Sequence, residues 1–170
     1  MIKQKWFDKK FEFKYSPADY DLLLNELMKT PEKILQIVSS LPEEILTKKI
    51  DNRWSIKENI GHLIDLEELH DGRIDDFISG KEILRPADLN NRKTDEANHN
   101  SKNISQLLIQ LEQVRENFLE RLSDLDASVR ERVAIHPRLN QPMRPIDMAQ
   151  FVLEHDEHHI QTIKELIASF

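Results

Sequence analysis

The sequence has no cysteine and only 3 glycines among its 170 residues. Without cysteine, the chain can form no disulfide, offer no thiolate to a metal ion and supply no thiol nucleophile of its own. Few β-branched runs and no alternating strand pattern argue against a sheet, whereas long stretches of Leu, Ile, Glu, Lys and Gln at three-to-four-residue spacing are typical of helices. We therefore expect an all-α protein.

The chain also has no stripe dense in lysine and arginine and no apolar run of 18 residues. Its net charge is −7. Because phosphate binding depends on concentrated positive charge, we expect no nucleic-acid partner. Residues 1–10 alternate charged and aromatic side chains and lack the apolar core of a signal peptide, so we also expect no membrane partner and a cytoplasmic location.

The length of 170 residues suits one domain with a proper core. Apolar stripes at helical spacing predict four main helices, at residues 31–40 with the segment before it, 56–79, 104–125 and 146–168. Thr30-Pro31 interrupts the first of them, which is one kinked helix or two. The polar segment 81–101 crosses over from the second helix to the third. We therefore expect a four-helix bundle in a single domain spanning residues 1–170.

Local signals mark the ends of the second helix. Ser55 and Glu58 have the spacing of a capping box, and Gly80 suits the left-handed residue that follows a last turn. Gly61 and Gly72 lie inside the helix, where each costs about 1 kcal/mol relative to alanine. We expect another group to approach the backbone closely at these two glycines.

Three further features are expected to lie outside any site. His99, in the crossover, is expected to be exposed. Arg115 belongs to the outer face of the third helix, which we expect to be solvated. Residues 134–142 contain two prolines and predict a loop.

Three of the seven histidines lie within five residues near the end of the chain, namely His155, His158 and His159. On a helix with about 100° per residue, His155 and His159 fall inside the apolar stripe and His158 falls at its edge. Two side chains one turn apart have Cβ atoms roughly 5–6 Å apart, so both imidazoles can bind one metal ion. A third ligand must come from another helix. The spacing alone leaves a metal site and hydrogen-bonded packing equally open.

The second helix carries two more histidines, with His62 on a flank of its apolar stripe and His70 near the middle. A histidine within an apolar stripe is ordinarily packed and hydrogen-bonded, and we expect this of His70. The sequence assigns no role to His99, His136 or His158.

Two motifs stand out when these features are combined. They are Trp54–Leu63, with the sequence WSIKENIGHL, and His155–Ile163, with the sequence HDEHHIQTI. In this order and at this separation they resemble the DinB/YfiT-like superfamily of bacterial metal-binding four-helix bundles, and the similarity spans nearly the whole chain. Asn140 stands where related sequences often have glycine, but asparagine also tolerates the left-handed conformation.

The resemblance implies that His62, His155 and His159 hold one divalent metal ion, with zinc, nickel, iron and manganese all open. It further implies a metal-dependent hydrolase, or an S-transferase that uses a low-molecular-weight thiol. The two chemistries share a site, because three neutral imidazoles leave an open position where water or a thiol becomes more acidic. Either implies a small-molecule substrate, and a homodimer stays open.

Asp65, Asp156 and Glu157 lie near these ligands in the sequence and are candidate bases or supports, with exposed-face carboxylates as the alternative. A second class of function also stays open. The three histidines could pin the second and fourth helices together as a structural staple in a binding or stress-response module. Four protein ligands and no access for solvent or a ligand would favour the staple. Three protein ligands at a site that opens onto a cleft would favour catalysis.

Overall fold

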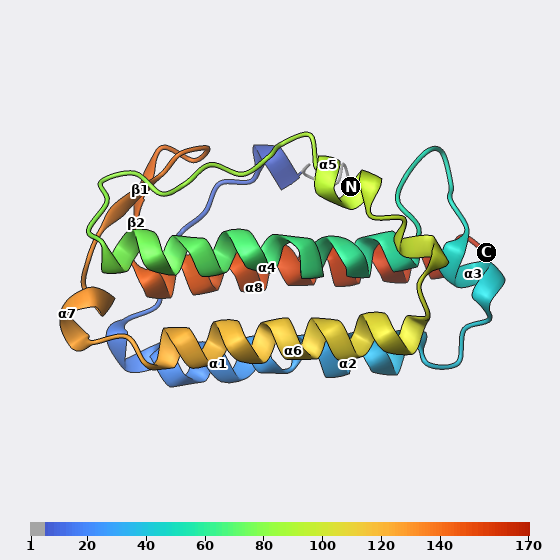
Figure 1. Cartoon of the computed structure of the whole chain (residues 1–170), viewed down its shortest axis with the longest axis horizontal. Coiled ribbons are helices and arrows are strands. Elements are labelled where there is room, and N and C mark those ends of the chain that lie inside the picture. Colours follow the sequence, from blue (N-terminus) through green and yellow to red (C-terminus); the bar gives the residue numbers. More distant parts are fainter. Residues whose placement is uncertain (1–5) are drawn as a thin grey trace.

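The computed structural model describes residues 6–170. Residues 1–5 lie outside the described residues. They are half of residues 1–10, the segment in which we expect no signal peptide. Five helices form the long rods of the bundle: α1 Tyr20–Met28, α2 Thr30–Val38, α4 Ile56–Ile78, α6 Ile104–Ser123 and α8 Pro145–Ile167. α1 and α2 lie end to end and together make one of its four sides (Figure 1). The predicted all-α bundle is confirmed, with two helices rather than one around Thr30. Within residues 6–170, no helix combines the length and the apolar character needed to cross a membrane.

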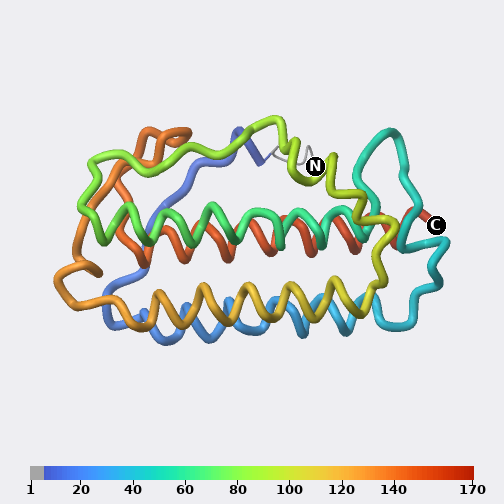
Figure 2. Tube along the Cα trace, viewed as in Figure 1, coloured from blue at the N-terminus to red at the C-terminus, as the bar shows by residue number. Residues whose placement is uncertain are grey.

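The direction of the helices explains the long crossover. α4 and α6 run the same way along the bundle (Figure 2), so the chain must travel back along its length between them. The returning segment lies over α4 (Figure 1) and contains α5 Arg92–Glu96 and a 3-10 turn, His99–Ser101. The other connections hold short elements: α3 Glu43–Thr47, α7 Ala127–Arg130 and the 3-10 turns Trp6–Asp8 and Pro17–Asp19.

Residues 134–142 are not the loop that their prolines predicted, so that prediction is wrong. They contain most of a hairpin in which β1 Ala134–His136 pairs antiparallel with β2 Gln141–Met143. Asn140 allows the turn by adopting a φ of 52°, and Ile135 makes two backbone hydrogen bonds with the crossover. Strands of three residues are too short to show an alternating pattern. The hairpin lies beside the bundle rather than in its core (Figure 1).

The predicted caps of α4 are confirmed. The N–H of Glu58 donates to Oγ of Ser55 at 3.2 Å, and the N–H of Ser55 donates to Oε2 of Glu58 at 2.8 Å. At the other end Gly80 has a φ of 72°. The N–H groups of Gly80 and Lys81 donate to carbonyls of the last turn at 3.1 and 3.0 Å, which closes the helix as a Schellman motif.

The close approach expected at the two helical glycines is also confirmed. A Cβ at Gly61 would lie 2.2 Å from Cγ of His99, and a Cβ at Gly72 would lie 2.0 Å from Nη1 of Arg85. His99 is 1% exposed, so the expectation that it is exposed is wrong. Its ring fills the space that Gly61 leaves, and its Nε2 lies 2.8 Å from Oδ2 of Asp65.

Two apolar clusters fill the bundle on either side of its middle. The first joins α1 to the last turns of α4 and α6 and the first turns of α8, with Leu23, Leu27, Phe77, Phe118 and Met148 among its members. The second joins α2 to the opposite ends of the same helices, with Ile34, Ile60, Leu63, Leu111 and Ile163 among its members.

A polar layer lies between the two clusters and takes one residue from each side of the bundle: Thr30, Glu67, Arg115 and Asp156, each at most 3% exposed. Nη2 of Arg115 donates to Oε1 of Glu67 at 2.8 Å and to Oδ1 of Asp156 at 3.1 Å. Thr30 Oγ1 donates to Asp156 Oδ2 at 2.8 Å. The expectation that Arg115 is solvated is therefore wrong. Burial opposes its charge, but the two carboxylates outweigh burial and raise the pKa of Arg115.

Replacing this buried cation should be costly. We expect Arg115→Met to lower the free energy of unfolding by about 3–5 kcal/mol, because two buried carboxylates lose their partner. The measurement is chemical denaturation followed by circular dichroism. Arg121→Met is the matched control on the same helix, because Arg121 pairs with Asp71 and Asp75 at the surface, where such pairs contribute less than about 1 kcal/mol. Equal losses from the two variants would contradict the role given to the polar layer.

The glycines differ in what a methyl group would meet. We expect Gly61→Ala to lower stability by about 1–3 kcal/mol, because the His99 ring cannot move aside without leaving Asp65. Gly72→Ala is the control, since it meets the half-exposed end of the long Arg85 side chain, which can shift towards solvent while Lys81 still pairs with Asp76, and it gains about 1 kcal/mol of helix propensity. Thermal melting compares the two. A cost at Gly72 that matches or exceeds the cost at Gly61 would be against this explanation.

Candidate metal centre

Three histidine side chains converge between α4 and α8. His62 comes from α4, and His155 and His159 come from α8, one turn apart. Each histidine has one ring nitrogen that lies within 4.8 Å of a ring nitrogen of both other histidines. The three residues are between 4% and 6% exposed. Nε2 of His155 and Nε2 of His159 are 3.2 Å apart. The structure thus brings together the three residues that the sequence motifs singled out.

The proton on His159 is placed by Asn59. Nδ2 of Asn59 donates to the backbone carbonyls of Trp54 and Ser55, at 3.2 and 2.8 Å. This fixes the orientation of the amide, so its Oδ1 is the atom 2.8 Å from Nδ1 of His159. An amide oxygen only accepts, so Nδ1 carries the hydrogen and Nε2 of neutral His159 keeps a lone pair.

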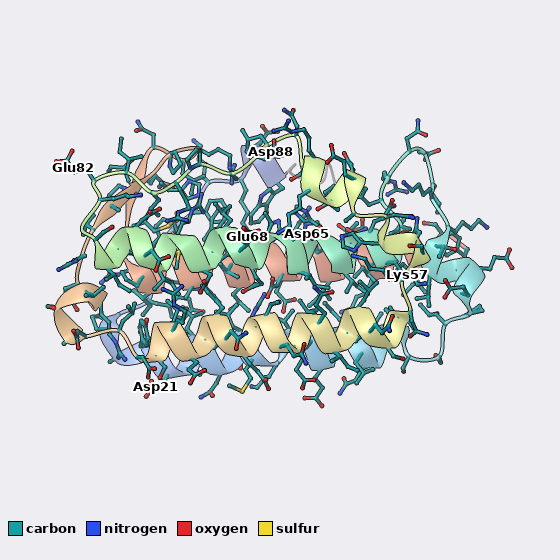
Figure 3. All side chains as sticks on the ribbon, in the orientation of Figure 1. Asp21, Lys57, Asp65, Glu68, Glu82 and Asp88 are labelled. Carbon is teal, nitrogen blue, oxygen red and sulfur yellow. The ribbon has the colours of Figure 1, made fainter. Side chains whose placement is uncertain are left out.

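The proton on His62 is placed in the same way by two successive hydrogen bonds, which connect His62 to Thr94 and Thr94 to Asp65. Thr94 Oγ1 donates to Oδ2 of Asp65 at 2.9 Å, so it accepts from Nδ1 of His62 at 3.1 Å. Nε2 of His62 is left with a lone pair. Burial would raise the pKa of Asp65, but hydrogen bonds from His99 and Thr94 outweigh it and lower that pKa. Asp65 lies on the part of α4 that the α5 segment covers (Figure 3).

Burial keeps all three imidazoles neutral. It lowers the pKa of His62 to about 4. For His155 and His159, burial and the neighbouring histidines hold the pKa well below its usual range. Neutral imidazole is the form that binds a metal ion, so the site needs no deprotonation near neutral pH.

The donor set fits a divalent transition-metal ion. Nitrogens at about 2.0–2.1 Å from a tetrahedral ion lie about 3.3 Å from one another, close to the 3.2 Å between Nε2 of His155 and Nε2 of His159. Imidazole suits zinc, nickel, iron and copper alike, so the donor set does not select among them. Nδ1 of His155 is buried without a hydrogen-bond partner among residues 6–170, so no second group orients this ring as Asn59 and Thr94 orient the other two.

A cavity of about 830 Å³ opens onto the three histidines. Trp6 lies edge-on to His155 with ring centroids 5.0 Å apart, and the Trp54 ring is 4.6 Å from that of His62. Leu66, which lies one turn after His62 on α4, also lines this cavity. The volume is typical of a site for a small organic molecule.

The other residues considered from the sequence are not part of the three-histidine cluster. His158 lines the cavity and stacks on Trp6, with centroids 5.4 Å apart, but it is not part of the three-histidine cluster. Asp156 faces the polar layer, and Glu157 forms an exposed ion pair with Lys33 at 2.7 Å. Neither carboxylate lines the cavity. Of the three candidate carboxylates, only Asp65 supports a histidine of the cluster, and it does so through Thr94.

The residues that orient the histidines were not predicted. Asn59 lies three positions before His62 in the first motif, and a polar residue on an otherwise apolar helical face is a signal that could have identified it. Thr94 lies 32 positions after His62 in a polar crossover. Nothing in the local sequence distinguishes it from its neighbours.

Comparisons with known proteins agree with this geometry. The profile of the DinB superfamily matches residues 26–163, which include all three clustered histidines. A comparison with curated proteins gives no match. Among solved structures, YfiT from Bacillus subtilis, described as a probable metal-dependent hydrolase with an unusual four-helix bundle topology, matches with a TM-score of 0.78 and 21% identity over 93% of this chain and 91% of its own. That match establishes the shared fold, and the profile covers most of the sequence. The chain therefore belongs to the DinB superfamily.

Proposed function

We propose that His62, His155 and His159 hold one divalent metal ion and that the protein is a metal-dependent enzyme acting on a small molecule. It either hydrolyses that molecule or transfers a low-molecular-weight thiol to it. The observation that carries the proposal is the convergence of three neutral imidazoles where a cavity of about 830 Å³ opens. The description of YfiT as a probable metal-dependent hydrolase supports the hydrolytic alternative.

The chemistry follows from three ligands and an open position. A divalent ion held by three imidazoles supplies a site where water or a thiol loses its proton more readily near neutral pH. The chain's own residues orient and shield that site. Asn59 and Thr94 aim the lone pairs of His159 and His62, and the Trp6 and Trp54 rings pack against His155 and His62.

The carboxylates nearby act at a distance from the substrate. Asp65 holds Thr94 and His99 and does not line the cavity. We therefore assign it a positioning role, in which it fixes the tautomer of His62, rather than the role of a base. Because the chain has no cysteine, a thiol transferred by this protein must come from another molecule.

The structural staple is the weaker alternative. Structural ions ordinarily have four protein ligands and no open position, whereas the cluster among residues 6–170 has three ligands and adjoins a cavity. Two apolar clusters also supply a core without any ion. A catalytic ion accounts for the cavity, and a staple does not.

The ligand set predicts a pattern of metal loss. We expect His155→Ala and His159→Ala each to lose the bound ion and His158→Ala to keep nearly all of it, because His158 packs on Trp6 outside the cluster. Metal content is measured by inductively coupled plasma mass spectrometry after dialysis, and circular dichroism checks that each variant is folded. Equal loss from all three substitutions would overturn the assignment.

Activity is expected to depend on the same ligands. Metal-loaded protein is assayed with ester, amide and lactone panels, and separately with thiols and electrophiles. Hydrolysis without a thiol identifies a hydrolase, and turnover that needs a thiol identifies a transferase. We expect His159→Ala to reduce either activity by at least about 100-fold, since losing a ligand should exceed the effect of losing its support. A fully loaded protein with a closed coordination shell and neither activity would support the staple instead.

A further inference from the structure

The cavity has a second polar region, away from the three histidines. It is lined by Arg73 on α4, His136 at the end of β1 and Arg138 in the hairpin turn. Arg73 lies 11 residues beyond His62 along the same helix, which is about 16 Å of helical rise. One molecule of moderate length, lying along α4, could therefore reach both ends.

His136 offers an unpaired donor at this end. The N–H of Leu139 donates to its Nδ1 at 3.2 Å, so Nδ1 holds the lone pair. Burial, with the charges of Arg73 and Arg138, lowers the pKa of His136 to about 3, so the ring is neutral and Nε2 carries the hydrogen. Nε2 is buried and has no hydrogen-bond partner among residues 6–170. The residue is 2% exposed, and such a donor is costly to bury unless a ligand accepts from it.

The two guanidinium groups carry positive charge that nearby carboxylates do not balance. Nη2 of Arg138 is buried without a hydrogen-bond partner among the described residues, and its guanidinium lies over the rings of Phe7 and Phe151, at 5.4 and 5.7 Å from their centroids. Burial lowers the pKa of Arg138. Arg73 is 1% exposed, and burial lowers its pKa to about 10 despite the opposing charge of Asp76.

That carboxylate is already engaged. Asp76 accepts two side-chain hydrogen bonds from Arg85, both at 3.0 Å, and one from Lys81 at 2.8 Å. The carboxylates that line the cavity are Asp88 and Glu165, and Asp88 pairs with Arg92 at 3.2 Å. The end of the cavity at Arg73 and Arg138 is therefore cationic, and two of its donors, Nε2 of His136 and Nη2 of Arg138, have no acceptor among residues 6–170.

We propose that Arg73, His136 and Arg138 form an oxyanion subsite that binds the carboxylate or phosphate of an anionic substrate. The subsite rests on the proposed function, because it places the other end of the same molecule at the three histidines. The guanidinium groups of Arg138 and Arg73 donate charge-assisted hydrogen bonds to the anion. The N–H of His136 donates a further hydrogen bond to it. The apolar wall between the two ends, including Leu66 and Leu69, packs against the body of the substrate. The enzyme is thereby selective for organic acids over their neutral analogues.

The test uses matched charged and neutral probes. 4-Phenylbutanoate, its amide 4-phenylbutanamide and inorganic phosphate are titrated by calorimetry into the metal-loaded protein. We expect the acid or phosphate to bind and the acid to bind at least about 10-fold more tightly than the amide. Arg138→Gln should weaken anion binding by about 10–100-fold, and Arg138→Lys should keep part of the preference. Arg53→Gln, which removes another arginine of the cavity wall, should leave it unchanged.

Each other outcome bears on the proposal. The proposal is overturned if the acid and the amide bind equally or if neither anion binds. It is also overturned if Arg138→Gln and Arg53→Gln weaken anion binding equally. The same titrations with His159→Ala separate the subsite from the metal. An acid preference that persists there supports the arginine end even if the proposed ion is never found. If the preference for the acid vanishes in His159→Ala but survives in Arg138→Gln, the anion binds at the histidines. That result overturns the subsite.

Discussion

A charge buried in a helical bundle must have its partner, and this constraint organises the middle of the molecule. Arg115 on α6 meets Glu67 on α4 and Asp156 on α8. Neighbouring residues of a helix point about 100° apart. The rotation that turns Asp156 toward Arg115 therefore turns His155, the preceding residue, toward α4 and the cavity. The polar layer therefore helps to determine where the three histidines meet, although none of its residues belongs to their cluster.

The crossover supplies contacts to α4 that support His62. It returns over α4 and brings Thr94 to His62, and it brings His99 to the space above Gly61. Both crossover residues meet the carboxylate of Asp65. A connection that lets two helices run parallel thus also orients one histidine of the cluster, His62. With Trp6 and the hairpin, it makes one wall of a cavity that has the three histidines at one end and, at the other, donors that have no acceptor among residues 6–170.

The features that the sequence predicted are those set by local spacing. The helices follow from their apolar period, and the ends of α4 follow from Ser55, Glu58 and Gly80. Gly61 correctly indicated a close approach, but not that His99 made it. What could not be predicted depends on contacts between distant segments. The local sequence around Arg115 predicts a surface residue. Its burial depends on two carboxylates, one from each of two other helices. Thr94 and the three-residue strands likewise acquire their roles only from partners elsewhere in the chain.

We propose that three neutral imidazoles, and no other protein group, hold one ion at the wall of the cavity. The test is anomalous diffraction from metal-loaded crystals, collected on both sides of the metal's absorption edge. We predict a single anomalous peak at about 2.0–2.2 Å from Nε2 of His62, Nε2 of His159 and one ring nitrogen of His155, with a non-protein atom in the remaining position. A peak elsewhere, or a fourth ligand from the protein, would rule out an open three-histidine site.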